Sequence, residues 1–509
     1  MFRTRLAPAR KLSVFFLFLS AVSTLSLQSA HAVKMGGLIF GDHMVLQREM
    51  KVPVWGSALP TENVTVTFNG QTKTAKTAAD GKWRVDLDPM TAGGPFTLKV
   101  RGLDSIVFTD VMVGEVWVGS GQSNMEGTTK SMGGVSLDSA RAANVPDLRV
   151  FTMWGDKTWR RCDSNAAFVT SATAFFFSKY LQADLKIPVG MLTSAVGGTS
   201  VEQWIDTATV HADPTFQGDS LAGGGFAAMI TPIIPMAMRG VIWYQGESNT
   251  GADSTVRWSY LNYRRRFGQL IPGWRKVWGQ GDFPFYFVQL PEMNALQTQP
   301  VAISPFAEVR EGQRLNLALP NTAMAVTLGL GDANDIHPRN KPPVGKRLAL
   351  LALANTYGRK VSHSGPEYVS MRAEGNHLRL LFTHTDGGLV AQGGGALKGF
   401  TLAGEDGKWQ WADATVSGDT VIVSSSAVAA PKHSRYAWAD NPVFNLWNGA
   451  GLPASPFRTD GPQLPIPVSL SPTPPGHGSR KVTHASAAWR TGGQRGTAVD
   501  AAGRFRKGK

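Results

Sequence analysis

The chain contains a single cysteine, Cys162, among 509 residues. An intramolecular disulfide is therefore excluded, and with it the small scaffolds that depend on disulfide bridges. A chain of this length can bury enough apolar surface to fold without such crosslinks. If the protein is exported, the absence of a disulfide framework is typical of a bacterial periplasm or culture medium.

Long apolar runs are absent after the first 32 residues, so no later segment predicts a membrane span. Residues 1–32 begin with four basic residues, continue through the apolar run SVFFLFLSAVSTLSL and end in Ala-His-Ala. This pattern predicts a signal peptide cleaved between Ala32 and Val33, and a periplasmic or secreted mature chain. The alternative is an uncleaved anchor, which is disfavoured because the run is shorter than the ~20 residues needed to cross a bilayer.

Acidic residues are fewer than basic ones, 37 against 51, which gives a formal net charge of +14. Residues 1–32 account for +4 of this charge and residues 463–509 for +7, so the remaining chain carries only about +3. A nearly balanced body gives little reason to expect a nucleic-acid or other polyanionic partner.

Residues 463–509 also lack a sustained apolar period and contain scattered proline, glycine and serine. This composition predicts a disordered basic tail. Two interpretations remain open: a solvated tail without a role, or a segment that binds an anionic surface through its basic end.

The body divides into three parts by its apolar periodicity. Residues 36–108 contain short alternating segments separated by turn residues, which predicts an N-terminal β-sandwich. Residues 109–357 alternate apolar strands with helical segments such as 172–185, and a further helix is expected after Pro343. This alternation predicts a doubly wound α/β domain with a mainly parallel sheet. Short strands return in residues 360–460, which predicts a second β domain.

Chemistry-bearing residues follow three of the predicted strands. EVWVGSGQSNME at 115–126 ends an apolar strand on a glycine-rich turn that presents Ser123. VIWYQGESN at 241–249 runs into a cluster of amide and acidic groups, and GDANDIHP at 331–338 supplies acids and a histidine. A serine, an amide cluster and an acid with a histidine are the groups that acyl transfer requires.

These segments carry a family resemblance. Together with LIFGDHMVLQRE at 38–49, VGGTSVEQW at 196–204, NDIHPRNK and the segment from 435 to 460, they resemble the sialate O-acetylesterases of the SGNH hydrolase superfamily. The resemblance covers about residues 36–460. It implies an SGNH-type catalytic domain flanked by β-sandwich-like segments, and a serine esterase that removes O-acetyl groups from carbohydrates. The alternatives are an acetylxylan or hemicellulose acetylesterase and a non-catalytic carbohydrate-binding protein.

Ser123 is the expected nucleophile and His337 the expected general base, because a serine hydroxyl needs a base at neutral pH and an imidazole can return the proton. Asp335 is the expected acid that orients His337. Family members commonly place this acid three residues before the histidine, where this chain has Asn334. Asp332 and Glu247 therefore remain as alternative acids.

The resemblance also implies donors for the developing oxyanion. They are the Ser123 backbone amide, the amide of Gly198 with Gly197 as its alternate, and a side-chain amide of either Asn249 or Gln245. The choice between the two amides stays open, because the chain's third block is shifted by one residue from the usual family pattern.

No cofactor and no metal are expected. His337 has no second histidine at ligand spacing, and the Gly223–Gly225 run lacks the lysine and helix of a phosphate-binding loop. The expected partner is an acetylated mono-, oligo- or polysaccharide. Arg339 and Arg160 are candidates for binding a sialate carboxylate, but the sequence does not decide between a sialic acid and a plant polysaccharide such as xylan or xyloglucan.

Overall fold

The computed structural model describes residues 33–250 and 260–461. The expected signal peptide and the expected basic tail lie outside these residues. Within the described ranges, no helix combines the length and apolarity needed to cross a membrane.

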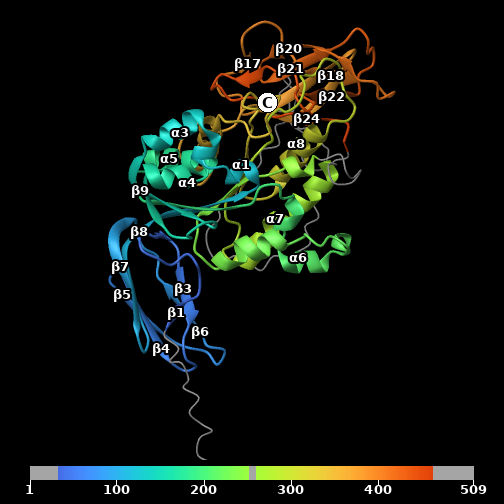
Figure 1. Cartoon of the computed structure of the whole chain (residues 1–509). Helices are drawn as coiled ribbons and strands as arrows, with labels where there is room; N and C mark the ends of the chain where they lie inside the picture. Colours follow the sequence, from blue (N-terminus) through green and yellow to red (C-terminus); the bar gives the residue numbers. More distant parts are fainter. Residues whose placement is uncertain (1–32, 251–259, 462–509) are drawn as a thin grey trace, which may run out of the picture. The chain divides into compact units, whose positions relative to one another are not determined.

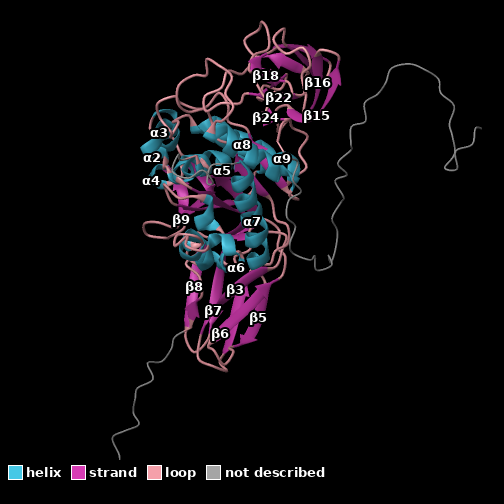
Figure 2. Ribbon diagram, turned by 90° about the vertical axis from the view of Figure 1, so that its right-hand side faces the viewer, coloured by secondary structure: helices cyan, strands magenta, loops and turns pink. Residues whose placement is uncertain are grey.

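The N-terminal part consists of β-strands (Figure 2), which form two sheets. Burial alternates along strands such as Asn63–Phe68 and Lys82–Leu87, as expected where one face of each strand packs on a core. One sheet is three-stranded and contains β1 (Lys34–Met35), β3 (Val52–Ser57) and β6 (Lys82–Leu87). The other contains β2 (Val45–Gln47), β4 (Asn63–Phe68), β5 (Gln71–Lys76), β7 (Gly93–Arg101) and the first half of β8 (Ser105–Gly121).

Strand β8 passes through the boundary that the sequence predicted at 108/109. Its first half pairs with β7 and its second half, from Glu115 onward, pairs with β11 and β12. The N-terminal strands and the central sheet are therefore joined by one continuous 17-residue strand. The periodicity of the sequence changes near 108, but the strand itself does not end there.

The central sheet has the order β10-β9-β11-β8-β12-β13-β14. All neighbours in it are parallel except the edge strand β10, which is antiparallel to β9. This is a mixed α/β fold, as the sequence predicted. The strands are β9 (Asn144–Thr152), β10 (Arg160–Asp163), β11 (Val189–Ala195), β12 (Gly240–Tyr244), β13 (Phe285–Val288) and β14 (Thr322–Ala325).

Helices connect these strands and cover both faces of the sheet. The α-helices are α1 (Ser123–Glu126), α2 (Thr129–Met132), α3 (Gly134–Arg141), α4 (Ser164–Val169), α5 (Ala172–Leu185), α6 (Thr207–Ala212), α7 (Tyr260–Trp278), α8 (Pro305–Leu315) and α9 (Lys341–Asn355). Shorter turns of 3₁₀ or π type are η1 (Val201–Trp204), η2 (Pro214–Phe216), η3 (Phe226–Ile230), η4 (Thr231–Ile233), η5 (Glu247–Asn249) and η6 (Asn316–Ala318).

Two of these helices bear on the sequence predictions. Helix α5 has the bounds expected from the sequence. Helix α9 begins at Lys341 rather than after Pro343, because prolines are tolerated in the first turn, where no intrahelical bond needs their missing N–H.

Aromatic contacts show how the two faces are filled. Trp117 of β8 packs edge to face on Phe177 of α5, whereas Trp243 of β12 packs on Phe267 and Trp274 of α7. Side chains of successive strand residues alternate between faces, so Ser120 points to the opposite face from Trp117. Trp243 is in register with Ser120 and therefore lies on that opposite face. Helices α5 and α7 therefore lie on opposite faces of the parallel strands (Figure 1).

The last part of the described chain again forms β-sheets, all with antiparallel pairing. Its strands are β15 (Glu367–Glu374), β16 (His377–Thr383), β17 (Leu389–Ala391), β18 (Phe400–Ala403), β19 (Gln410–Trp411), β20 (Asp413–Ser417), β21 (Thr420–Ser424), β22 (His433–Tyr436), β23 (Leu446–Asn448) and β24 (Phe457–Arg458). The buried Arg310 of α8 donates to the backbone carbonyls of Ala439 and Asp440 and so ties this part to the central domain.

Candidate active site

The three chemistry-bearing segments meet at the carboxyl end of the central sheet. Strand β8 is flanked by β11 and β12, and Ser123 follows β8, Gly197 follows β11 and Glu247 follows β12. The chain leaves β8 for the β9 edge, returns to β11 and then crosses to β12, so the order of the strands reverses beside β8. Such a switch point is where open α/β sheets form a crevice for ligands.

The turn that presents Ser123 depends on Gly121. This glycine has φ 133°, and a Cβ at this position would lie 2.1 Å from the carbonyl oxygen of Tyr244. Only glycine fits such close contact with the neighbouring strand at this backbone angle. The chain then starts helix α1 at Ser123, which places the hydroxyl at the end of the sheet.

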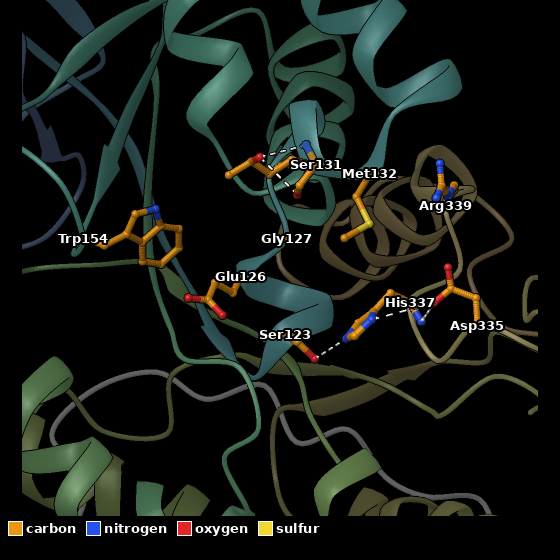
Figure 3. Close-up of a pocket in the computed structure, with 10 residues that line it drawn as sticks. Ser123, Glu126, Gly127, Ser131, Met132, Trp154, Asp335, His337 and Arg339 are labelled. Carbon is orange, nitrogen blue, oxygen red and sulfur yellow. Dashed lines mark hydrogen bonds and ion pairs between the residues drawn. The ribbon is translucent and has the colours of Figure 1, made fainter.

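Ser123 and His337 are in direct contact. The Oγ of Ser123 lies 2.8 Å from Nε2 of His337, a hydrogen-bond distance between residues 214 positions apart in the sequence (Figure 3). With the proton of Ser123 directed at Nε2, the imidazole is placed to accept it.

Asp335 contacts His337 mainly through the backbone. Its Oδ1 accepts a hydrogen bond from the His337 backbone N–H at 2.8 Å and lies 3.8 Å from Nδ1 of the ring. The second distance is too long for a hydrogen bond, so the carboxylate acts on the ring only electrostatically. Both side chains are about two-fifths exposed, so solvent screens this interaction.

The two alternative acids lie in different surroundings. Asp332 is exposed, and its Oδ1 accepts from the Asn334 backbone N–H within the turn. Glu247 is buried, and its Oε1 accepts from Nδ2 of Asn124 at 2.6 Å. Burial raises the pKa of Glu247, and the Asn124 bond only partly opposes this shift. No hydrogen bond joins either of these acids to the His337 ring among the described residues.

The residues expected to form the oxyanion hole divide into two groups. Gly197 and Gly198 are both exposed, and a Cβ on Gly197 would lie 3.4 Å from the Ser123 Cβ. The Gly197 N–H donates to Oε2 of Glu126 at 2.6 Å. Asn249 donates its Nδ2 to Glu202, and Gln245 donates its Nε2 to Asn249, to Gln122 and to the Thr199 carbonyl. Both of these amides are fully buried and neither lines the cavity at Ser123.

A cavity of about 500 Å³ opens at Ser123. It is lined by Ser123, Glu126, Gly127, Thr128, Ser131, Met132, Trp154, Asp335, His337 and Arg339. Figure 3 shows Trp154 on one side of Ser123, and Asp335 and Arg339 on the other. Arg339 is exposed, and its guanidinium has no ion pair in the described part of the chain, whereas Arg160 is paired with Asp156 and does not line the cavity.

Several cavity residues were not singled out from the sequence. Glu126 belongs to the motif that presents Ser123, but its contact with Gly197 spans 71 residues and no local pattern shows it. Trp154 follows β9, at the same sheet end as the serine, which is the only sequence signal that would have identified it. Among residues 33–250 and 260–461 no group of three or more histidine, cysteine, aspartate or glutamate side chains is placed to hold a metal ion.

Known proteins with similar sequence or structure support an esterase. A family model described as "Carbohydrate esterase, sialic acid-specific acetylesterase" matches residues 113–354. The human sialate O-acetylesterase is 31% identical over 399 residues, which cover 67% of this chain and 75% of the human protein. The rat sialate O-acetylesterase is 29% identical and covers 82% of this chain and 92% of its own length.

A solved structure is also similar. A carbohydrate acetylesterase from Xanthomonas citri matches with a TM-score of 0.78 at 37% identity, over 84% of this chain and all of that one. The resemblance seen in the sequence motifs is thereby confirmed, and the protein is a carboxylic ester hydrolase. The chain belongs to the family of carbohydrate esterases described as sialic acid-specific acetylesterases.

Proposed function

We propose that this protein removes O-acetyl groups from carbohydrates as an SGNH-type hydrolase, with Ser123 as nucleophile and His337 as general base. The observation that carries this assignment is the 2.8 Å contact between Ser123 Oγ and His337 Nε2 at the floor of an open cavity. A non-catalytic carbohydrate-binding protein would have no need of this pairing.

The proposed reaction has two steps. Ser123 Oγ bonds to the acetyl carbon while its proton passes to His337 Nε2, and the bond to the sugar oxygen then breaks as His337 returns the proton to that oxygen. In the second step water bonds to the acetyl carbon of the acetyl-enzyme and gives a proton to His337. The bond from this carbon to Ser123 Oγ then breaks as His337 returns the proton to Oγ, which releases acetate and free Ser123.

Asp335 is the proposed acid. Its bond to the His337 backbone N–H holds the loop, and its carboxylate stabilises the imidazolium that forms in each step. Glu247 remains the alternative, although its raised pKa and its bond to Asn124 make it a weaker partner for a cation.

The proposed oxyanion donors are the backbone amides of Ser123 and Gly198. The Gly197 amide is engaged by Glu126, and the buried amides of Asn249 and Gln245 support the loops behind the serine rather than facing the cavity. Backbone donors held by these loops would stabilise the negative charge on the acetyl carbonyl oxygen.

An O-acetylated sialic acid is the proposed substrate. Arg339 lines the cavity and has no ion pair among the described residues, which supports this choice because arginine binds carboxylates through two parallel hydrogen bonds. One observation favours a neutral acetylated polysaccharide such as xylan instead: the Glu126 carboxylate lies in the same cavity and would repel an anionic sugar.

Acetate release from O-acetylated sialic acid and from acetylated xylan, measured side by side, tests both the catalytic residues and the substrate that we propose. Ser123→Ala should abolish turnover on both substrates, and Arg339→Gln should raise KM for the sialic acid alone. Near wild-type turnover by Ser123→Ala would overturn the catalytic assignment. Faster release from xylan, with no effect of Arg339→Gln, would move the substrate to a neutral polysaccharide.

We also propose that the protein acts in the periplasm or outside the cell, on the basis of the signal-like residues 1–32. N-terminal sequencing of the protein recovered from each cell fraction tests this, with Val33 as the expected first residue.

A further inference from the structure

Lys341 is a buried lysine that belongs to neither the cavity nor the proposed chemistry. It is the first residue of α9, its side chain is fully buried, and it lies four positions after His337. Its Nζ donates a hydrogen bond to Oδ1 of Asn124 at 2.5 Å. Asn124 is the residue that follows the nucleophile, so the ammonium reaches the turn that carries Ser123.

The Asn124 amide nitrogen completes a link between three loops. Its Nδ2 donates to Oε1 of Glu247 at 2.6 Å and to the backbone carbonyl of Ile336 at 2.9 Å. Ile336 directly precedes His337. The Asn124 side chain thus bonds both the loop after β12 and the loop that holds the general base, and Asn124 itself directly follows the nucleophile.

The chemistry of the partners fixes the orientation of this amide. An ammonium can only donate, so it must face the Asn124 oxygen, whereas a carboxylate and a carbonyl accept and must face the nitrogen. Exchanging oxygen and nitrogen would break all three contacts. Asn124 is fully buried, so a broken contact would leave a buried polar group unpaired.

Burying an ammonium is costly, and the surroundings offset this only in part. Burial lowers the pKa of Lys341 to about 8, against the opposing effect of the Glu247 and Asp335 carboxylates. The ring of Tyr244 lies 5.4 Å from Nζ and adds a weak attraction. These are the charged and titratable groups of the described chain that face Lys341. A costly buried charge with one well-formed contact, at the residue beside the nucleophile, needs a reason beyond packing.

We infer that Lys341 is a positioning residue that, through Asn124, holds the Ser123 turn and the His337 loop at reacting distance. This inference rests on the proposed function, because it assigns the Ser123–His337 contact to catalysis. Without the ammonium the Asn124 oxygen loses its donor, and the amide is held only through Nδ2 by Glu247 and Ile336, so it fixes the histidine loop less firmly. A displacement of about 1 Å between reacting groups lowers rates on the order of a hundredfold.

The central comparison is between Lys341→Met, Glu247→Gln and the double variant Lys341→Met/Glu247→Gln. The single lysine variant leaves the Glu247 carboxylate buried without a nearby cation, so both its stability and its kcat should fall. The double variant removes that stranded charge and should regain thermal stability. Its kcat should remain about tenfold to a hundredfold below that of Glu247→Gln, with KM little changed, since Asn124 still lacks its anchor.

The pH profile separates positioning from a purely structural role. Wild-type kcat should fall above about pH 8 as Lys341 loses its proton, because a neutral amine can accept as well as donate and so no longer fixes the orientation of the Asn124 amide. This decline should be absent from both variants that carry methionine. The rate at which a fluorophosphonate labels Ser123 should follow the same pattern, which excludes an effect on deacetylation alone.

A second double variant tests the inference if Lys341→Met does not fold. Asn124→Asp/Glu247→Gln keeps the net charge of the cluster and the contact with Lys341, but it removes the donor to the Ile336 carbonyl. We expect a loss of kcat with KM unchanged.

Three results would overturn the inference. The first is a wild-type kcat in Asn124→Asp/Glu247→Gln, and the second is a kcat in Lys341→Met/Glu247→Gln that recovers to that of Glu247→Gln. The third is a loss of kcat in Glu247→Gln alone as large as that in Lys341→Met/Glu247→Gln. Absence of esterase activity in the wild-type protein would instead overturn the proposed function.

Discussion

The backbone N–H of Gly197 donates a hydrogen bond to the carboxylate of Glu126 at 2.6 Å, beside the Ser123 hydroxyl. A Cβ placed on Gly197 would lie 2.8 Å from this carboxylate oxygen and 3.4 Å from the Ser123 Cβ, so these three groups lie close together. A negative charge is thus held near the Ser123 hydroxyl, close to the backbone amides that we propose as oxyanion donors. The contact stabilises the glycine loop and opposes the chemistry proposed beside it.

Glu126→Gln should therefore raise kcat/KM. Glutamine keeps an oxygen that can accept from Gly197 but removes the charge, and removing about 1 kcal/mol of repulsion in the transition state is on the order of a fivefold gain. The gain should be larger for an anionic acetylated sugar than for a neutral ester, which steady-state kinetics on both substrates would measure.

Asp332→Asn is the matched control for Glu126→Gln, because it removes an exposed carboxylate that does not line the cavity. It should leave kcat/KM nearly unchanged. A lower kcat in Glu126→Gln would mean that the charged contact with Gly197 is needed to shape the loop.

The acid that supports His337 can be identified by comparing Asp335→Asn with Glu247→Gln. Asp335 is the carboxylate beside the His337 ring, so its neutral variant should lower kcat by between about fivefold, the limit for an exposed pair, and about 10⁴, the loss in a tight triad. Glu247→Gln should cost less, because glutamine can still accept from Asn124. A larger loss in Glu247→Gln would transfer the role to Glu247, and two small losses would indicate a Ser123–His337 dyad.

Local patterns in the sequence were sufficient for the strands that precede the three motifs and for the largely buried helix α5. The spacing of apolar residues in 172–185 marks α5, and the three motifs after β8, β12 and β14 hold the residues that the structure brings near Ser123. These features depend on residues close together in the chain. They are the features that periodicity and turn chemistry can detect.

Contacts between distant residues could not be predicted in this way. The hydrogen bond between Gly197 and Glu126 spans 71 residues and that between Lys341 and Asn124 spans 217. Neither contact produces a periodic pattern in the sequence. The same holds for Asn249, which the family pattern suggested as an oxyanion donor but which bonds Glu202 inside the protein. A side-chain amide has both donors and acceptors, so only its three-dimensional neighbours decide which role it takes.

Stability should depend on the buried Glu115 in β8. Arg239 donates to it at 2.6 Å and 3.0 Å, and Arg48 from the N-terminal part also donates to it. Glu115→Gln should lower the free energy of unfolding by about 3–5 kcal/mol at pH 7, the usual cost of stranding the partners of a buried ion pair. Urea denaturation followed by circular dichroism would measure this. Glu49→Gln, which removes an exposed partner of the same two arginines, should cost less than about 1 kcal/mol.

The Glu115 effect should also depend on pH. Burial raises the pKa of Glu115, but the bonds and charges of Arg239 and Arg48 outweigh it and hold the pKa below its ordinary value. The charged form therefore stabilises the folded protein above the ordinary glutamate pKa, and the contribution is lost as pH falls through the lowered value. The difference between wild type and Glu115→Gln should shrink below about pH 4. A difference that grows on acidification would contradict the assignment.

Removal of residues 462–509 should leave folding and hydrolysis intact. These residues contain none of the groups assigned to chemistry, and their composition lacks the apolar content to offset the backbone entropy of ordering them, about 1–2 kcal/mol per residue. A chain ending at Gly461 should keep the melting temperature and the turnover of the full chain on a small acetyl ester.

The position of the cut matters because Asp460 joins Arg435 to Arg458. It accepts from Arg435 at 2.7 Å and from Arg458 at 2.6 Å. Burial raises the pKa of Asp460, but these two arginines bring it down to about 2. A chain ending at Thr459 leaves both arginines without this partner and should melt at a lower temperature than one ending at Gly461. Equal melting temperatures would show that the Asp460 pairing contributes little, and loss of activity in the longer truncated chain would show that residues beyond 461 belong to the functional unit.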